Sequence, residues 1–242
     1  MALRHCGLLL AAGKGTRLAS TSEGVPKALV RVGRETLVEH NLRRLVEAGC
    51  ERVVVVMGFQ GGLVKAHVAS GPWAASAVFV EQTEFLGTAH AVAISREALG
   101  SGPFLLAYCD NYTPYRLDPL IAAHESQGNV VTLACFRAED PSRHGILQLS
   151  GSRVVNIVER PKEPAGNLAF AGMGAFEPDI YAAVDKVRRA DSGEYYLTDA
   201  IMDLVREGKP VGVDVLDCFR VNINSPSELE KAWMFALKDA QA

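Results

Sequence analysis

The feature that most constrains the fold of this sequence is a series of apolar runs, each as long as a β-strand, which alternate with stretches of helical spacing. The runs are rich in Val, Ile and Leu, and they lie at 7–12, 52–58, 76–82, 103–111 and 129–136. A strand that is apolar at nearly every position is buried on both faces. Such strands, when helices connect them, form a parallel sheet that is covered by helices on both sides.

Helical spacing is clearest between residues 36 and 49, where apolar side chains stand at positions 37, 38, 42, 45 and 46 before Gly49 ends the pattern. Further helices are expected at 90–99 and near 117–127. The alternation predicts an α/β fold. Ligands of such folds bind at the carboxyl ends of the strands.

The second half of the chain is less regular. Residues 145–159 are typical of a β-hairpin that turns at Ser150-Gly151-Ser152. The segment Ser225-Pro226-Ser227-Glu228 predicts a capping box with proline at the first helical position, and the helix that follows is expected to end near Ala240. No linker, repeat or low-complexity stretch divides the sequence, so residues 1–242 are expected to form a single domain.

Charge and cysteine usage exclude several classes of protein. The net charge of −3 indicates neither a nucleic-acid partner nor a membrane surface. No uninterrupted apolar run reaches about 18 residues, the length needed to span a membrane. The five cysteines are scattered, odd in number and without a CxxC pair, which favours reduced thiols over disulfides or a zinc site. A cytoplasmic protein is therefore expected.

The first apolar run ends abruptly in Gly13-Lys14-Gly15-Thr16-Arg17. Two glycines let backbone N–H groups approach an anion, and Arg17 adds a planar guanidinium that suits phosphate oxygens. Neither familiar phosphate motif fits, because the P-loop requires glycine where Leu8 stands and the dinucleotide fingerprint requires glycine where Leu18 stands. The loop alone also allows a turn that carries a solvated basic tip.

Residues farther along the chain match the pattern of a known family. Residues 11–18 read AAGKGTRL and residues 26–29 read PKAL, which resembles the AAGxGTRL and PKxL signature of the sugar-1-phosphate nucleotidylyltransferases. Residues 82–91 and 193–199 resemble the QxExLGTxHA and GEYYxTD segments of bacterial N-acetylglucosamine-1-phosphate uridylyltransferases, and Val221-Asn222 resembles their late VN. The resemblance extends over nearly the whole chain.

This resemblance implies a Rossmann-like fold with a mixed, mainly parallel sheet flanked by helices. It further implies a nucleotide-binding core at about 1–135 and a sugar-binding lobe at about 136–242. Arg17 and Lys27 are then the catalytic cations that meet the triphosphate. Gln82, together with the backbone at Gly87, is expected to read a pyrimidine base. The other expected nucleotide contacts are Leu10, Ala11, Ala12, Gly13, Gly15, Thr16 and Thr88. His90 is expected to be structural.

The resemblance also implies a magnesium site. Asp110 follows the fourth apolar run and matches the metal-binding aspartate of the family, although Cys109 replaces the glycine that usually precedes it. Asn222 matches the second ligand, and Asn224 is an alternative. A site built from oxygen atoms that keeps several waters suits Mg²⁺. Cys109 has no partner nearby in the sequence and is not expected to act as a nucleophile.

The acceptor is expected to contact Gly145, Glu159 and Arg160, with Arg160 standing where the family usually has lysine. Phe170 stands where the family usually has asparagine. The acceptor is therefore expected to be a sugar-1-phosphate or cyclitol phosphate other than N-acetylglucosamine-1-phosphate.

The implied reaction is attack of a sugar-1-phosphate oxygen on the α-phosphorus of a nucleoside triphosphate, with UTP favoured and pyrophosphate released. Two unit charges 4 Å apart repel by about 4 kcal/mol at an effective dielectric constant near 20, so catalysis must consist largely of cations and alignment. Thymidylyl, guanylyl or cytidylyl transfer, including transfer to phosphocholine, is an alternative. A silent regulatory subunit is another, against which the presence of Arg17, Lys27, Asp110 and Asn222 argues.

Overall fold

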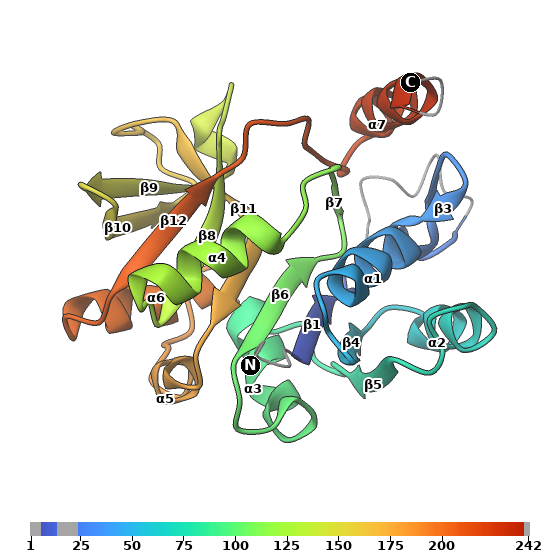
Figure 1. Cartoon of the computed structure of the whole chain (residues 1–242), viewed down its shortest axis with the longest axis horizontal. Coiled ribbons are helices and arrows are strands. Elements are labelled where there is room, and N and C mark those ends of the chain that lie inside the picture. Colours follow the sequence, from blue (N-terminus) through green and yellow to red (C-terminus); the bar gives the residue numbers. More distant parts are fainter. Residues whose placement is uncertain (1–5, 14–23, 240–242) are drawn as a thin grey trace.

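The structure is a computed structural model that describes residues 6–13 and 24–239, and its centre is a nine-stranded sheet (Figure 1). The strand order is β5-β4-β1-β6-β11-β8-β12-β10-β9. The bounds are β1 Cys6–Leu10, β4 Arg52–Met57, β5 Ala77–Glu81, β6 Phe104–Tyr108, β8 Val131–Arg137, β9 Gly145–Ser150, β10 Arg153–Glu159, β11 Leu168–Phe176 and β12 Val211–Val215. Only β10 and β11 run against the other seven strands. The predicted α/β fold with a mixed, mainly parallel sheet is confirmed.

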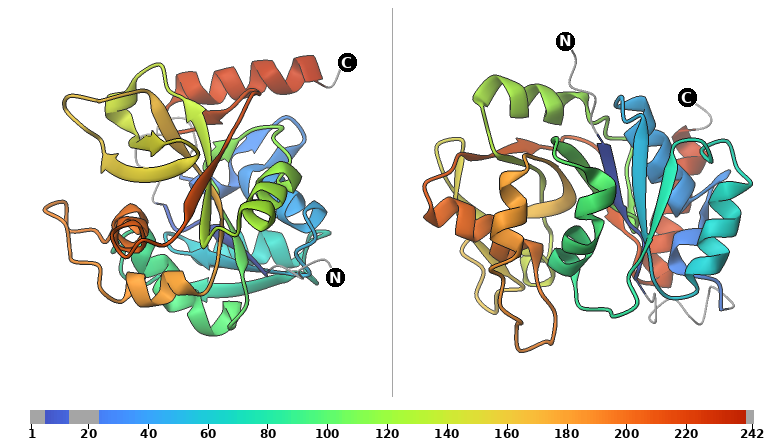
Figure 2. Two further views of the ribbon diagram at one scale, coloured as in Figure 1. Left: turned by 60° about the vertical axis from the view of Figure 1, so that its left-hand side comes forward. Right: turned by 90° about the horizontal axis from the view of Figure 1, so that it is seen from below.

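Helices cover both faces of this sheet (Figure 2). One face packs against α3 (Thr88–Leu99), α5 (Asp179–Val184) and α6 (Leu197–Arg206), and the other against α1 (Leu37–Glu47), α2 (Gly61–Ala69) and α4 (Asp118–Gln127). Successive strand residues supply the two layers, because strand side chains alternate between faces. Leu8 belongs to the first layer and Leu9 to the second, and both are fully buried. The uninterrupted apolar runs are thus explained by burial on both sides.

The two halves of the chain share the sheet. Strand β11 lies between β6 and β8, which both precede it in the sequence, and pairs with both in antiparallel orientation. The predicted hairpin is confirmed, since β9 and β10 pair across the turn at Gly151. The division into a core and a lobe near residue 135 stays a prediction, as does the single domain.

Short elements place residues from near the C-terminus of the chain beside the segment that follows β6. Strand β13 (Val221–Asn222) pairs with β7 (Asn111–Tyr112), which places Asn222 opposite Asn111. The other short elements are β2 (Arg31–Val32), β3 (Glu35–Thr36), η2 (Lys27–Leu29) and η3 (Pro141–Arg143). None of the helices in residues 6–13 and 24–239 combines the length and the apolar character needed to cross a membrane.

Helix α7 (Pro226–Asp239) begins where the sequence predicts, but half of its predicted capping box is wrong. The Glu228 N–H donates to Ser225 Oγ at 3.4 Å, as expected. The Glu228 carboxylate instead accepts from the N–H of Asn224, at 2.8 Å, and not from that of Ser225. The carboxylate thereby fixes the backbone of Asn224 next to the site described below.

Candidate active site

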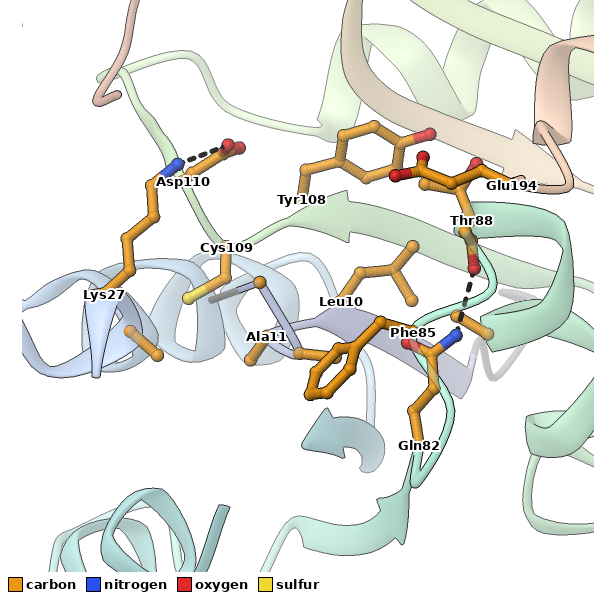
Figure 3. Close-up of a pocket in the computed structure, with 15 residues that line it drawn as sticks. Leu10, Ala11, Lys27, Gln82, Phe85, Thr88, Tyr108, Cys109, Asp110 and Glu194 are labelled. Carbon is orange, nitrogen blue, oxygen red and sulfur yellow. Dashed lines mark hydrogen bonds and ion pairs between the residues drawn. The ribbon is translucent and has the colours of Figure 1, made fainter. Parts of the chain in front are cut away.

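A cavity of about 560 Å³ opens at the carboxyl ends of β1, β5 and β6 (Figure 3). This is the edge at which parallel sheets bind ligands. The lining contains all of the expected nucleotide contacts that the structure describes. Its residues are Leu10, Ala11, Ala12, Gly13, Lys27, Ala28, Gln82, Phe85, Gly87, Thr88, Ala91, Tyr108, Cys109, Asp110 and Glu194.

The chain leaves β1 along one wall of the cavity. Ala11 N–H donates to Val56 O at 2.9 Å, which extends the path of the strand. Gly58 makes this packing possible, since a Cβ there would lie 2.7 Å from Ala12 O. The predicted phosphate contacts Gly15, Thr16 and Arg17 lie outside the described residues.

The Gln82 amide is held in one orientation. Its Nε2 donates to Gly87 O at 3.1 Å and lies 2.9 Å from His90 Nδ1 (Figure 3 shows the Gln82 side chain). A carbonyl oxygen can only accept, so the NH₂ group must face Gly87. The Gln82 oxygen is then the atom offered to a ligand. His90 thus contacts the predicted base-reading residue, and its structural role stays a prediction.

Two of the segments that resemble the family, residues 82–91 and 193–199, are joined by backbone hydrogen bonds, and we call this connection the clamp. Tyr195 N–H donates to Leu86 O at 2.7 Å, and Ala89 N–H donates to Tyr195 O at 2.9 Å. Thr88 Oγ1 accepts from Leu197 N–H at 2.9 Å, so this hydroxyl already serves the backbone. The clamp brings Glu194 to the cavity wall.

Gly87 is the tightest point of this clamp, and its replacement tests the clamp. Its φ is +95°, and a Cβ would lie 2.6 Å from Tyr195 O. We expect Gly87→Ala to lower the free energy of unfolding by about 1–3 kcal/mol and to weaken nucleotide binding about tenfold or more by displacing the Gln82 partner. Chemical denaturation and nucleotide titration measure the two effects. Gly62→Ala is the matched control, because Gly62 lies in α2 with open space around it. Unchanged nucleotide affinity in Gly87→Ala would contradict the clamp.

The predicted metal residues converge around Lys27, whose side chain is only 10% exposed. Lys27 Nζ lies 2.7 Å from Asp110 Oδ2 and 2.7 Å from Asn224 Oδ1. Asn224 Nδ2 donates in turn to Asn222 Oδ1 at 2.5 Å. Residues from three distant parts of the chain thus form one polar network.

Backbone pairing sets the position of this network. Ile223 N–H donates to Asp110 O at 2.9 Å. The buried Asn41 side chain of α1 donates to Cys109 O and Asn111 O, each at 3.1 Å. These bonds join the turn after β6 to β13 and to α1.

The oxygen atoms of this network fit a magnesium ion. A carboxylate and an amide oxygen are the hard ligands that Mg²⁺ takes, with water and phosphate completing its shell. Within the described parts of the chain, no three His, Cys, Asp or Glu side chains gather as they do in an all-protein metal cage. Asp110 could hold the ion together with Asn222, or with Asn224 in its place, and this assignment stays a prediction.

Sequence reasoning missed Arg220, whose guanidinium lies 4.0 Å from the centre of the Phe136 ring and donates to Asn111 Oδ1 at 2.5 Å. Burial lowers the pKa of Arg220 to about 10, although the charge of Asp110 opposes this shift, so the group stays cationic at neutral pH. The sequence feature that could have identified Arg220 is its position two residues before Asn222, because alternate residues of a strand point to the same face.

Tyr108 and Glu194 were also missed as lining residues. Tyr108 stands two residues before Asp110 at the end of a predicted strand, and Glu194 lies within the matched GEYYLTD segment. Burial raises the pKa of the Tyr108 phenol, which keeps it protonated. Burial, together with the charge of Asp110, raises the pKa of the Cys109 thiol, which agrees with the expectation that Cys109 is not a nucleophile.

The predicted acceptor residues gather in the β9–β10 hairpin, outside the cavity lining. Gly145 pairs with Glu159 across the two strands, and a Cβ on Gly145 would lie 3.0 Å from Glu159 Oε2. Desolvation raises the pKa of the Glu159 carboxyl, although the charge of Arg160 acts in the opposite direction. Phe170 is buried, and its ring packs edge-on against the cavity residue Tyr108, with 5.7 Å between ring centres.

Comparisons with known proteins agree with this geometry. A family model described as nucleotidyl transferase matches residues 6–233. The chain is 29% identical over 231 residues to the UTP–glucose-1-phosphate uridylyltransferase AglF of Haloferax volcanii, with 93% of each chain covered. It is 35% identical over 238 residues to the bifunctional protein GlmU of Ruegeria sp. (strain TM1040), covering 93% of this chain and 51% of that protein.

The fold has a close counterpart among solved structures. A crystal structure of a UDP-glucose pyrophosphorylase complexed with UDP-glucose superposes with a TM-score of 0.87 at 19% identity and covers 97% of this chain and 99% of its own. From the family match over residues 6–233, the chain belongs to the nucleotidyl transferase family.

Proposed function

We propose that this protein transfers a nucleoside monophosphate from a nucleoside triphosphate, with UTP favoured, to a sugar-1-phosphate and releases pyrophosphate. The observation that carries the proposal is the network of Lys27, Asp110, Asn222 and Asn224, of which Lys27 and Asp110 line the same cavity as Gln82. The printed activity of AglF, which uses UTP and glucose-1-phosphate, supports it.

The residues in this arrangement suit the joining of two anions. The acceptor phosphate is already ionised near neutral pH, so the site needs no general base. When bound, Mg²⁺ would neutralise charge on the phosphate oxygens, and Asp110 and Asn222 would hold it. Lys27 adds positive charge, and on the sequence Arg17 and the backbone N–H groups of the glycine loop are expected to contact the phosphates as well.

The fixed Gln82 amide favours one kind of base. Its oxygen accepts a hydrogen bond, which the ring N–H of uracil or thymine donates, whereas the corresponding ring nitrogen of cytosine is itself an acceptor. We therefore expect UTP to be the best donor, dTTP the second, and CTP poorer by about tenfold or more, since an unpaired buried polar group costs about 1–3 kcal/mol. Purine nucleotides are expected to be poor as well, on the resemblance to uridylyltransferases. Pyrophosphate release at varied nucleotide concentration gives kcat/KM for each donor. A higher kcat/KM with CTP, GTP or ATP would refute the base assignment.

On the acceptor side of the site, this chain has the phenyl ring of Phe170 at a position where the family usually has an asparagine amide. Phe170 packs against Tyr108 and offers no hydrogen bond to an N-acetyl group. Glucose-1-phosphate or a cyclitol phosphate is therefore expected to be a better acceptor than N-acetylglucosamine-1-phosphate. The decisive experiment is pyrophosphate release across four nucleotides and a panel that also includes phosphocholine. Absence of product from every pair would favour a silent regulatory subunit.

A cytoplasmic location is part of the proposal. All five cysteines lie within the described ranges and are free thiols. Free thiols persist in a reducing compartment.

A further inference from the structure

We infer that Lys27 and the metal ion compete for the carboxylate of Asp110, so that the lysine and the ion bind it in alternation. The inference rests on the proposed function, because it takes Asp110 and Asn222 as the ligands of the ion.

The first argument is the carboxylate oxygen that Lys27 occupies. Lys27 Nζ lies 2.7 Å from Asp110 Oδ2, and contacts of 2.7 Å to Asn224 and 2.5 Å from Asn224 to Asn222 connect it to the second predicted ligand. The other oxygen of the carboxylate, Oδ1, lies 3.5 Å from Asn111 Nδ2. An ion that takes Asp110 Oδ2 as its ligand must therefore displace the ammonium from that oxygen.

The second argument is the fixed direction of the hydrogen bonds. An ammonium can only donate, so Asn224 must turn its oxygen toward Lys27 and its NH₂ toward Asn222. The NH₂ of Asn224 then requires the oxygen of Asn222 to face it. Lys27 thus keeps the Asn222 amide with its oxygen toward the network, which is the atom that a metal ion requires.

The third argument is charge. The side chains of Lys27 and Asp110 are 10% and 25% exposed, so solvent screens the pair poorly. A divalent cation brought to the same carboxylate would be repelled by the ammonium at close range. Metal binding therefore requires Lys27 to leave, and a triphosphate in the cavity offers it a new anionic partner. Lys27 lines that cavity (Figure 3).

Alternation makes metal affinity depend on Lys27 before any nucleotide is present. We expect Lys27→Met to bind Mn²⁺ about tenfold or more tightly than the natural protein, since a cation close to a ligand changes its affinity for positive charge by one to three orders of magnitude. Electron paramagnetic resonance of free Mn²⁺ measures this without any activity assay. Lys65→Met is the matched control, because Lys65 is an exposed lysine of α2, and its affinity should not change.

Two further variants keep the result unambiguous. Lys27→Gln removes the charge but retains a hydrogen-bond donor, and it should show the same gain even if Lys27→Met folds poorly. Asp110→Asn combined with Lys27→Gln should abolish the gain, which locates the ion at Asp110. Mn²⁺ affinity that is equal to or weaker than that of the natural protein in a folded Lys27 variant would overturn the inference. Magnesium-dependent pyrophosphate release by the natural protein reports on the proposed function separately.

Discussion

Asp110→Asn is expected to lower kcat/KM by about a hundredfold or more while the protein stays folded. The loss follows from the role of charge, since a neutral amide holds a divalent ion far less well than a carboxylate, and this reaction depends on cations that stabilise phosphate charge. Pyrophosphate release at saturating Mg²⁺ measures the loss, and circular dichroism reports on the fold. Asp118→Asn is a suitable control, because the Asp118 side chain is 58% exposed and pairs with Arg116 at the surface.

The choice of asparagine matters because of Lys27. Alanine at position 110 would remove the carboxylate that lies 2.7 Å from a largely buried ammonium, and an uncompensated buried charge destabilises a protein by several kcal/mol. Asparagine retains an oxygen that accepts from Lys27. Full turnover by the natural protein in excess EDTA would contradict the metal site.

The strands of the first half were predictable because burial on both faces leaves a continuous apolar run in the sequence. The position of β11 within the sheet could not be predicted from the sequence. Its insertion between β6 and β8 depends on pairings between residues 31 or more positions apart, such as Met173 with Ala107 and Gly174 with Leu133. Apolar periodicity reports which residues are buried but not which strand lies beside which.

Motif spacing identified the residues that gather at the cavity, but it gave no orientation for them. Asp110 and Asn222 were paired only by resemblance, whereas the structure brings them together through β7 and β13. The contacts of Lys27 with Asp110 and Asn224 had no sequence signal, because they join residues 83 and 197 positions apart. Similarly, only the contact with Gly87 O determines which end of the Gln82 amide faces a ligand.

The capping residue Glu228 shows the same limit at short range. The Ser-x-x-Glu spacing predicts a helix start, and the helix does begin there. The carboxylate accepts from the N–H of Asn224, and its other oxygen accepts from Arg143 of η3 at 3.0 Å. The Ser-x-x-Glu spacing predicts neither partner.

The largest difference in kinetic constants is expected between Lys27→Ala, which should lower kcat, and Glu159→Gln, which should raise KM. Lys27 supplies positive charge that counts most in the transition state, so its loss should lower kcat by about a hundredfold or more for every acceptor. Arg17→Ala is expected to behave in the same way on the sequence resemblance. Glu159 is expected to hold acceptor hydroxyls equally in the ground state and the transition state, so Glu159→Gln should mainly raise KM for the sugar phosphate, by about tenfold.

The pH dependence of the acceptor KM distinguishes Glu159 further. Desolvation holds the pKa of the Glu159 carboxyl above 4.5, its ordinary value. The ionised carboxylate is therefore lost at a higher pH than for an exposed glutamate, and the acceptor KM of the natural protein should begin to rise as pH falls toward that raised pKa. Glu159→Gln should lack this rise. Steady-state kinetics with both substrates varied measure KM and kcat together. If Glu159→Gln changed only the nucleotide KM, or if Lys27→Ala changed KM for the acceptor without lowering kcat, the assignment of Lys27 to the phosphates and of Glu159 to the acceptor would be wrong.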